Sequence, residues 1–240
     1  MIVCHRYKFI FIKPRKAAST SVEIALSRLC DAADIVTPLS REDELLRQSE
    51  GGQRPVNYRP RGWYIYPGYW AKALRDRKAP RAFKGHTPAC RARECLADSV
   101  WQTYTKISVT RNPWDMTVSH YYWRLWELNK RGYDVTDFSL NDYITYLYTY
   151  YPKWLTNWYR MADKGELLID RVLRYEHLAD DITELGQSFG LTDELRLPRI
   201  RAKGQHRQDQ RNYRELLGEQ ERRMIEAAAK SEIEAFNHSW

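Results

Sequence analysis

The sequence predicts an α/β fold in which a mostly parallel central sheet is flanked by helices. Short apolar segments of strand length alternate with longer segments whose apolar residues have helical spacing. Three strand-to-helix junctions, at residues 16–21, 85–86 and 111–119, carry basic or hydroxyl side chains. Strands that alternate with helices favour parallel pairing, and 240 residues suffice for one domain with a full core. We therefore expect a single domain over residues 1–240.

The first third of the chain predicts a strand, a tight loop and a helix, followed by an insertion. Tyr7–Lys13 (YKFIFIK) is short, aromatic and β-branched, and Pro14 ends it. Ser19–Cys30 has apolar residues at helical spacing and hydroxyl residues suited to its N-cap. Residues 31–80 are irregular and rich in glycine, proline and aromatic residues. A long irregular segment in a compact domain is usually functional, so we interpret 31–80 as an insertion on the substrate side.

The middle of the chain holds the clearest strand and the clearest helix. Tyr104–Thr110 alternates apolar and polar residues, as a strand does. Asn112 as N-cap and Pro113 at the first helical position begin a helix over Trp114–Lys130, which Gly132 is suited to end. The other expected elements are a strand at Arg81–Lys84, a helix at Pro88–Ser99, helices at Asn141–Tyr151 and Lys153–Ala162, a strand at Leu167–Arg174, and helices at Glu176–Phe189, Arg214–Leu217 and Glu219–Phe236.

The composition favours an anionic partner. Lysine and arginine number 39 against 31 acidic residues, which gives a net charge of +8. This charge is spread along the chain, so nucleotide phosphates, acidic glycans, nucleic acid and membrane surfaces all satisfy it. No apolar segment approaches the ~20 residues that span a bilayer, and we expect no membrane span. We expect a cytoplasmic location if Met1 is the native start, although a trimmed luminal domain would show the same pattern.

The cysteines and histidines do not predict a metal site. Four cysteines are too few and too scattered for a disulfide framework. His86, Cys90 and Cys95 lie close in sequence, but no CxxC pair or second group of ligands accompanies them. We therefore expect buried thiols and no metal.

The first junction has the features of an anion site. Its sequence is Lys16-Ala17-Ala18-Ser19-Thr20-Ser21. A helix N-terminus presents unpaired N–H groups and partial positive charge to phosphate or sulfate. The small side chains let a ligand approach the backbone, the hydroxyl groups add donors, and the lysine adds a full charge. An ordinary N-cap beside a surface lysine is the alternative interpretation. The lysine precedes the small residues, unlike in the GxxxxGK[ST] loop of nucleoside triphosphatases.

The third junction is suited to a phosphate monoester. Arg111 stands at the end of the expected strand and carries a planar fork of donors. Ser119 lies nearly two turns into the helix and can offer a hydroxyl group toward the same side. A structural arginine and an ordinary helical serine are the alternative interpretation.

Together these junctions resemble the sulfotransferases that use 3′-phosphoadenosine 5′-phosphosulfate (PAPS), particularly the carbohydrate branch that includes the heparan sulfate 2-O-sulfotransferases. In that family a K-x-x-S/G-T-S loop binds the 5′-phosphosulfate, and Lys16–Ser21 matches it. An R-[ND]-P…S-x-Y-Y element grips the 3′-phosphate, and Arg111–Pro113 with Ser119–Tyr122 matches that. The resemblance implies a P-loop-like three-layer fold, PAPS as co-substrate, an acceptor hydroxyl and no metal.

The resemblance also implies roles for basic residues. Lys16 is the candidate that stabilises the leaving oxygen during in-line sulfuryl transfer, while Lys13 and Arg15 flank the loop as alternatives. The family segment that resembles 173–178 is expected to be structural.

A late basic loop commonly closes over the nucleotide in sulfotransferases. Lys203, Gly204 and Arg207 are therefore candidates for contact with the 3′-phosphate. A solvated basic face is the alternative.

The acceptor hydroxyl needs a base, and His86 resembles the catalytic histidine of the 2-O-sulfotransferases. An imidazole with an ordinary pKa of about 6.5 can accept a proton near neutrality. A buried, hydrogen-bonded histidine is the alternative. His120 and His177 lie inside expected helices and are not favoured, while His206 in the basic loop is a second choice.

Two other functions fit part of the sequence. A P-loop kinase-like phosphotransferase would bind ATP with Mg²⁺. A basic, aromatic nucleic-acid-binding protein would explain the charge but not the paired junctions, so we expect no nucleic-acid partner. The sequence identifies neither the acceptor nor the oligomeric state. Aromatic residues at 63–70 and 143–158 are suited to stacking on a sugar or to packing in the core.

Overall fold

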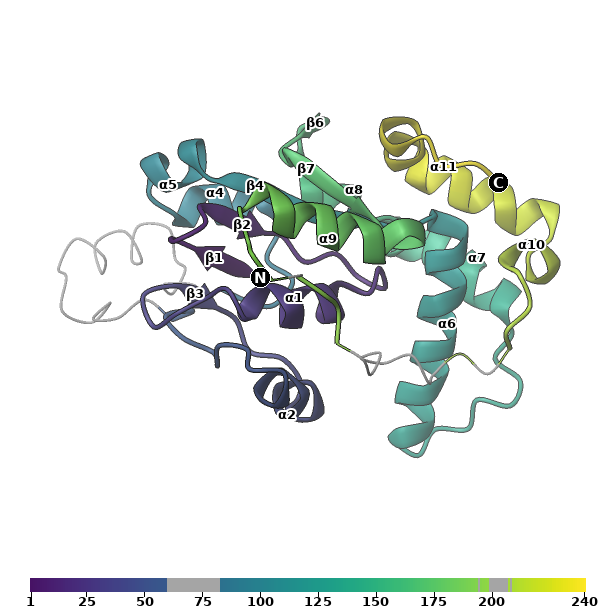
Figure 1. Cartoon of the computed structure of the whole chain (residues 1–240). Coiled ribbons are helices and arrows are strands. Elements are labelled where there is room, and N and C mark those ends of the chain that lie inside the picture. The colour runs from purple at the N-terminus through teal and green to yellow at the C-terminus, as the bar shows by residue number, and fades with distance from the viewer. Residues whose placement is uncertain (60–82, 194, 199–206, 208) are drawn as a thin grey trace, which may run out of the picture.

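A five-stranded sheet forms the centre of the protein, with helices on both faces and a further group of helices at one end (Figure 1). The computed structural model describes residues 1–59, 83–193, 195–198, 207 and 209–240. In sheet order, the strands are β3 (Ile35–Val36), β1 (Ile2–Cys4), β2 (Phe9–Phe11), β4 (Thr105–Thr110) and β7 (Arg171–Arg174).

The sheet is mostly parallel, as predicted. β2 pairs in parallel with β4, and β4 pairs in parallel with β7. β1 runs antiparallel to both β2 and β3, so it alone among these five strands points the other way. Because parallel strands end at the same edge, the segments that follow β2, β4 and β7 meet there.

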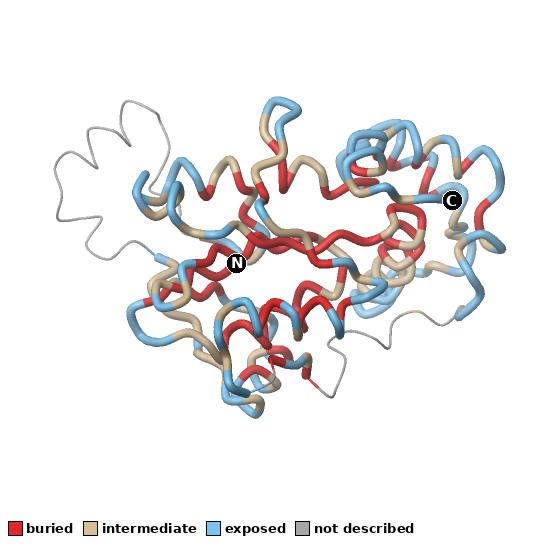
Figure 2. The backbone as a smooth tube through the Cα atoms, turned by 45° about the horizontal axis from the view of Figure 1, so that its top comes forward, coloured by how far each residue is buried: buried red, intermediate tan, exposed pale blue. Residues whose placement is uncertain are grey.

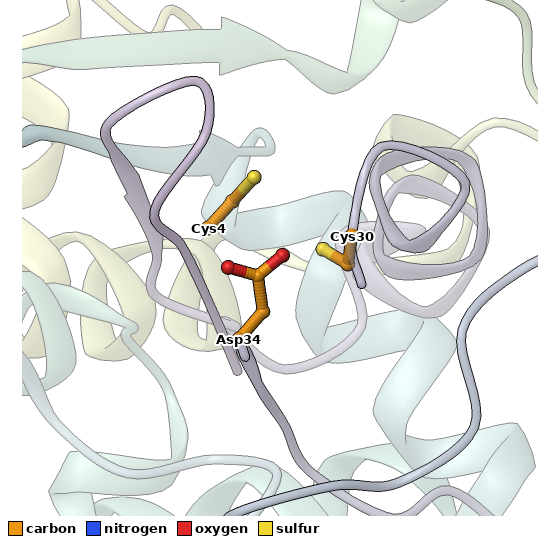
Figure 3. A group of neighbouring side chains, drawn as sticks. All are labelled: Cys4, Cys30 and Asp34. Atoms are coloured by element: carbon orange, nitrogen blue, oxygen red, sulfur yellow. The ribbon is translucent and has the colours of Figure 1, made fainter. Parts of the chain in front are cut away.

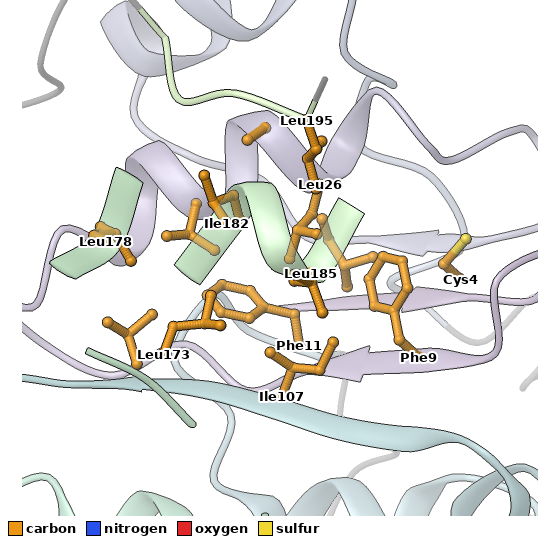
Figure 4. Packing of buried hydrophobic residues seen from close by; sticks show 14 of the residues in the cluster. Cys4, Phe9, Phe11, Leu26, Ile107, Leu173, Leu178, Ile182, Leu185 and Leu195 are labelled. Carbon is orange, nitrogen blue, oxygen red and sulfur yellow. The ribbon is translucent and has the colours of Figure 1, made fainter. Parts of the chain in front are cut away.

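One face of the sheet packs against α1 (Ser19–Ser27) and α9 (Leu178–Ser188). Figure 4 shows Phe11 of β2 beneath these two helices, which contribute Leu26 and Leu185 to the same apolar cluster. Buried residues run along the strands and along α1 (Figure 2). This packing fixes the start of α1 at the edge where the parallel strands end.

The opposite face and the end of the molecule carry the remaining helices. Met1, Val3 and Ile10 face a cluster that includes α4 (Ala89–Cys95) and Met161. A separate apolar cluster joins four helices beside the sheet, namely α6 (Pro113–Lys130), α7 (Leu140–Tyr150), α10 (Tyr213–Leu216) and α11 (Glu219–Phe236). None of the helices in the described ranges is both long and apolar enough to cross a membrane.

The start of α6 confirms the predicted cap. The side chain of Asn112 accepts hydrogen bonds from the N–H groups of Trp114 and Asp115, at 3.1 and 3.4 Å. Pro113 occupies the first helical position, where its missing N–H costs nothing. Gly132 follows the helix with φ +82°, a left-handed conformation that glycine adopts without strain.

Two strands of the central sheet lie where the sequence predicted none. β1 has three residues, too few for a periodic pattern to be visible. β3 lies inside the expected insertion at 31–80 and pairs with β1, so the beginning of that segment belongs to the sheet. α2 (Arg41–Ser49) follows it, capped by the hydroxyl of Ser40. The rest of this segment from residue 60 onward lies outside the described residues.

Several predicted elements are shorter or divided. The helix expected at Pro88–Ser99 is interrupted by extended backbone at Leu96 and Ala97, which separates α4 from α5 (Asp98–Thr103). The strand expected at Arg81–Lys84 is not present at residues 83 and 84, and 81–82 are not described.

The segments around residues 153–174 also differ from the prediction. The expected helix at 153–162 is replaced by η1 (Pro152–Trp154) and the four-residue α8 (Trp158–Met161). The break has a cause: the Glu232 carboxylate accepts hydrogen bonds from the Thr156 hydroxyl and the Asn157 N–H. The strand expected at 167–174 is divided into β6 (Glu166–Leu167), which pairs with β5 (Ala162–Asp163), and β7. A 3₁₀ turn, η2 (Tyr175–His177), precedes α9.

Candidate functional site

A pocket of about 950 Å³ opens where the three parallel strands end. The loop after β2 contributes Lys16, the residue after β4 contributes Arg111, and the residue after β7 contributes Tyr175. Ligands of open α/β sheets bind in this position. Another cavity, of about 550 Å³, lies between α7 and α11 and contains none of the predicted site residues.

The loop before α1 has an unusual backbone. Lys16 and Ala18 have φ angles of +56° and +51°, in the left-handed region that residues with a Cβ rarely adopt. Ala18 is the N-cap of α1 and makes no side-chain cap. As a result, the structure shows no protein acceptor for the N–H groups of Ser19 and Thr20 among the described residues. These donors, at the positive end of α1, suit an anion.

Three side chains fix this loop in place. Asn157 accepts from the N–H of Arg15 at 2.8 Å and donates to its carbonyl at 2.9 Å. The Ser19 hydroxyl donates to the carbonyl of Pro14 at 2.7 Å. Arg111 Nη1 donates to the carbonyl of Lys16 at 2.6 Å. The loop is therefore held before any ligand arrives.

Hydroxyl groups line the pocket beside the loop. Thr20, Ser21 and Ser119 all contribute to its wall. Their hydroxyl oxygens have no hydrogen-bond partner within the described part of the chain. Ala18 also lines the pocket, whereas the Ala17 side chain is fully buried in the core beneath it. The predicted loop residues are thus brought together, with Ala17 contributing packing.

Two arginines share one carboxylate in the pocket. Asp115 bonds to Arg111 through Oδ2, with Nε at 2.8 Å and Nη2 at 2.7 Å. Its Oδ1 lies 2.8 Å from Nη1 of Arg207. Arg111 also lies over the Tyr175 ring, 4.0 Å from its centroid. Both predicted arginines therefore line a single pocket, while Lys203 and Gly204 lie outside the described residues.

Lys13 has a different role from its neighbours. It is buried, and its Nζ lies 2.7 Å from the carboxylate of Glu23 on α1. Arg47 of α2 approaches the same carboxylate at 3.4 Å. Burial alone would raise the pKa of Glu23, but the cations around it, Lys13 foremost, lower that pKa to about 2. Lys13 does not line the pocket, which leaves Arg15 and Lys16 as the cations of the loop that do.

Arg15 and Lys16 face aromatic rings in the pocket wall. The Arg15 guanidinium lies 3.5 Å from the centroid of Trp154, and Lys16 Nζ lies 5.6 Å from the centroid of Trp123. Arg15 has no carboxylate partner among the described residues, and both Arg15 and Lys16 line the pocket. This part of the pocket is therefore strongly cationic.

His86 lines the pocket, and its surroundings fix its tautomer. Nδ1 lies 3.1 Å from the carbonyl oxygen of Lys13, which can only accept, so Nδ1 carries the proton and Nε2 has a free lone pair. The pKa of His86 is lowered to about 3. The main cause is the loss of solvent where the protein covers part of the ring, and the positive charges of Lys13 and Arg160 add to it. The neutral ring is thus able to accept a proton at Nε2.

The structure adds pocket residues that the sequence did not favour. His120, Trp123 and Trp154 form one wall, although His120 was set aside as a helical residue. Ser119 and Trp123 are four residues apart on α6, so one helical face carries both, and that spacing was the available signal. His177 ends a 3₁₀ turn instead of lying inside a helix, and it too lines the pocket with its neighbours at 175–180. Residues 175–178 of the segment expected to be structural therefore line the pocket, whereas Leu173 is buried in the core. His206 and residues 63–70 are not described.

Cys4, Cys30 and Asp34 form a second cluster at the other end of α1 (Figure 3). Their ligand-type atoms lie within 4.8 Å of one another. The Asp34 carboxylate already accepts the N–H groups of His5 and Asp31, at 2.7 and 2.8 Å. The cluster is thus hydrogen-bonded within the protein, and none of its members lines the pocket.

The protein has an α/β fold, and its pocket lies at the ends of the parallel strands, where open α/β sheets bind ligands. A family model described as the sulfotransferase domain matches residues 17–185 of the chain. The match covers most of the sequence and includes α1, Arg111 and Ser119, so the chain belongs to the sulfotransferase family and is a transferase of sulfuryl groups. No curated protein matches the chain.

Proposed function

We propose that this sulfotransferase moves the sulfuryl group of PAPS to the hydroxyl group of an acceptor, with carbohydrates as the first acceptor class to test. The observation that carries the proposal is the position of Lys16 and Arg111 in one pocket, joined by the hydrogen bond from Arg111 to the Lys16 carbonyl. One adenosine bisphosphate can therefore contact both. The finer resemblance to the heparan sulfate 2-O-sulfotransferases belongs to the same proposal.

The pocket supplies suitable partners for each part of the donor. The start of α1, with Thr20 and Ser21, faces the 5′-phosphosulfate, while Arg111, Ser119 and Arg207 face the 3′-phosphate. Apolar surface at the other side of the pocket suits the purine; it comes from Leu178, Ala179, Leu197 and Pro198. Lys203 and Gly204 remain candidates for the 3′-phosphate.

The reaction is an in-line displacement at sulfur. The acceptor oxygen forms a bond to sulfur as the bond between sulfur and the 5′-phosphate oxygen breaks, and adenosine 3′,5′-bisphosphate leaves. Lys16 stabilises the charge that develops on the leaving oxygen. The scheme needs no metal. Positioning of the reactants and stabilisation of charge supply the rate enhancement.

His86 is the base in this scheme. Its Nε2 lone pair receives the acceptor proton, and Nδ1 keeps its bond to the Lys13 carbonyl. A base with a low pKa attracts protons weakly in the empty pocket. The negative charges of bound PAPS raise that pKa, so the base becomes stronger once the donor is in place.

Isothermal titration calorimetry tests the donor. We expect adenosine 3′,5′-bisphosphate to bind at least about tenfold more tightly than ADP, since a charged hydrogen bond to the 3′-phosphate is worth about 1.5–3 kcal/mol. A preference for ATP with Mg²⁺ would instead favour a kinase. Transfer of radiolabelled sulfate from PAPS to a panel of glycans, lipids and small alcohols then identifies the acceptor class. Absence of both bisphosphate binding and transfer would contradict the proposal.

A further inference from the structure

His120 has the environment of a fixed hydrogen-bond donor, not of a core residue. Its ring stacks against Trp154 and Trp123, with centroids 5.1 and 5.7 Å away and planes within 16° and 10° of parallel. Only 4% of the residue is exposed, yet it lines the pocket. The two flat contacts prevent the ring from turning out of its plane.

The two nitrogens of His120 face different surroundings. Nδ1 lies 2.7 Å from the hydroxyl of Tyr143, a residue of α7 that is buried in the apolar cluster of the end helices. The two ring nitrogens point in diverging directions, so Nε2 points away from α7. His120 contributes to the pocket wall, and its Nε2 has no hydrogen-bond partner among the described residues, so Nε2 is the nitrogen available to a ligand.

Tyr143 decides which nitrogen carries the proton. Its hydroxyl has no other hydrogen-bond partner among the described residues, and a buried hydroxyl proton left without an acceptor is costly. The hydroxyl therefore donates to Nδ1, which must be unprotonated. Burial, then the charges of Lys16, Arg15 and Arg124, lower the pKa of His120 to about 3, so the ring is neutral. A neutral ring with bare Nδ1 carries its proton on Nε2.

His120 lies beside the lysine that the proposed reaction uses. Lys16 Nζ and the His120 ring both contact Trp123, and the lysine charge acts on the histidine. An N–H donor at this position suits an oxygen of a sulfuryl group held next to Lys16. His86 has the opposite tautomer, with its free lone pair on Nε2.

We propose that the Nε2–H group of His120 donates a hydrogen bond to an oxygen of the transferring sulfuryl group, and that Tyr143 is the positioning residue that fixes this tautomer. This inference rests on the proposed function. It gives His86 and His120 different tasks, because His86 accepts the acceptor's proton while His120 stabilises charge on the group in transfer.

Two substitutions at the same position isolate the donor. Both His120→Gln and His120→Asn remove the stacked ring, but only the glutamine amide nitrogen reaches the position of Nε2. We expect His120→Asn to lower the rate about 100-fold, as loss of one such donor does elsewhere, and His120→Gln to lower it less than about tenfold. Rates are measured with the best acceptor of the panel and with water as acceptor. Bisphosphate affinity by calorimetry should stay near that of the unaltered protein in both variants.

Tyr143→Phe completes a double-mutant cycle. Removal of the hydroxyl lets the His120 proton move to Nδ1. We therefore expect Tyr143→Phe alone to lower the transfer rate a few-fold, and the same substitution added to His120→Asn to lower it no further. Equal rates for the glutamine and asparagine variants would overturn the donor role. A parallel fall of bisphosphate affinity and rate would show that the ring is structural. If the unaltered protein neither binds the bisphosphate nor transfers sulfate, the proposed function itself fails and this inference falls with it.

Discussion

The loop before α1 and the aromatic wall formed by His120, Trp123 and Trp154 line the same pocket, yet different forces shape them. The loop depends on its own backbone, with left-handed φ angles at Lys16 and Ala18 that open the start of α1 to an anion. The wall depends on packing between segments far apart in sequence, where Trp154 of η1 meets His120 of α6. Replacement of a loop residue should thus directly affect how the anion binds or reacts. Replacement of a supporting residue should instead act by displacing the residues that it holds in place.

Removal of Lys16 is the strongest test of this difference. We expect Lys16→Ala to lower the transfer rate about 1000-fold, because the variant loses the positive charge that the proposed reaction places at the leaving oxygen. The fold should be unchanged by circular dichroism and thermal unfolding, because the Lys16 side chain lines the pocket instead of packing in the core. Lys230→Ala, an exposed change on α11, is the matched control. Normal turnover of the Lys16 variant would remove it from the mechanism.

His86→Ala should affect chemistry without affecting donor binding. We expect a rate about 100-fold lower, within the usual contribution of a general base, and unchanged affinity for adenosine 3′,5′-bisphosphate. Rapid-quench measurement of a single turnover separates the chemical step from product release. An unaltered rate would show that another group, or water, takes the proton.

Asn157→Ala should act through position alone. The variant loses both hydrogen bonds to the Arg15 backbone, so the loop can leave its strained conformation. We expect bisphosphate to bind about tenfold more weakly, as befits the loss of one or two buried hydrogen bonds. Asn157→Asp keeps the acceptor but not the donor, so its affinity for the bisphosphate should lie between that of the unaltered protein and that of Asn157→Ala. If affinity does not change, the loop holds its shape without this clamp.

Glu232→Gln should change stability more than activity. Burial raises the pKa of Glu232 to about 7, well above the ~4.3 of an unfolded glutamate. The folded state therefore holds a proton that the unfolded state has released, and this group's contribution to stability is lost as pH rises from about 4.3 through 7. We expect the variant to be more stable than the unaltered protein at pH 8, on the order of 2 kcal/mol, but not at pH 4. Chemical denaturation at both pH values checks this, and a difference that does not depend on pH would contradict it.

The smallest expected effect is an absence of change with pH. The pKa values of His86 and His120 are both lowered to about 3, so neither histidine gains a proton near its ordinary pKa. We therefore expect neither His86 nor His120 to cause an inflection in kcat/KM, which reports the free enzyme, between pH 5.5 and 7.5, near the ordinary histidine pKa of about 6.5. A clear fall below pH 6.5 would mean that a pocket histidine titrates normally.

The sequence could predict the loop and the strand ends because their chemistry is local. Small and hydroxyl side chains, such as those of residues 17–21, are typical of a helix start that binds an anion. Asn112 followed by Pro113 indicates a helix start without any distant partner. The parallel order of β2, β4 and β7 followed from the alternation of strands and helices.

The aromatic wall and some boundaries could not be predicted because they depend on distant partners. His120 looks like an ordinary helical residue until α7 supplies Tyr143 and η1 supplies Trp154. The helical pattern at 153–162 is real, but Glu232 captures the backbone at Asn157 and stops the helix. Likewise, the sequence left Lys13 and Arg15 as alternatives to Lys16, and only the structure shows that Lys13 is paired with buried Glu23.

Asp115 has a further consequence for the catalytic cycle. Held between Arg111 and Arg207, it acts as an internal counter-ion that keeps two cations at a set spacing in the empty pocket. An arriving nucleotide then meets a site that needs little rearrangement. The same carboxylate also repels the phosphates of a bound nucleotide, so its charge opposes nucleotide binding while its contacts fix the two arginines.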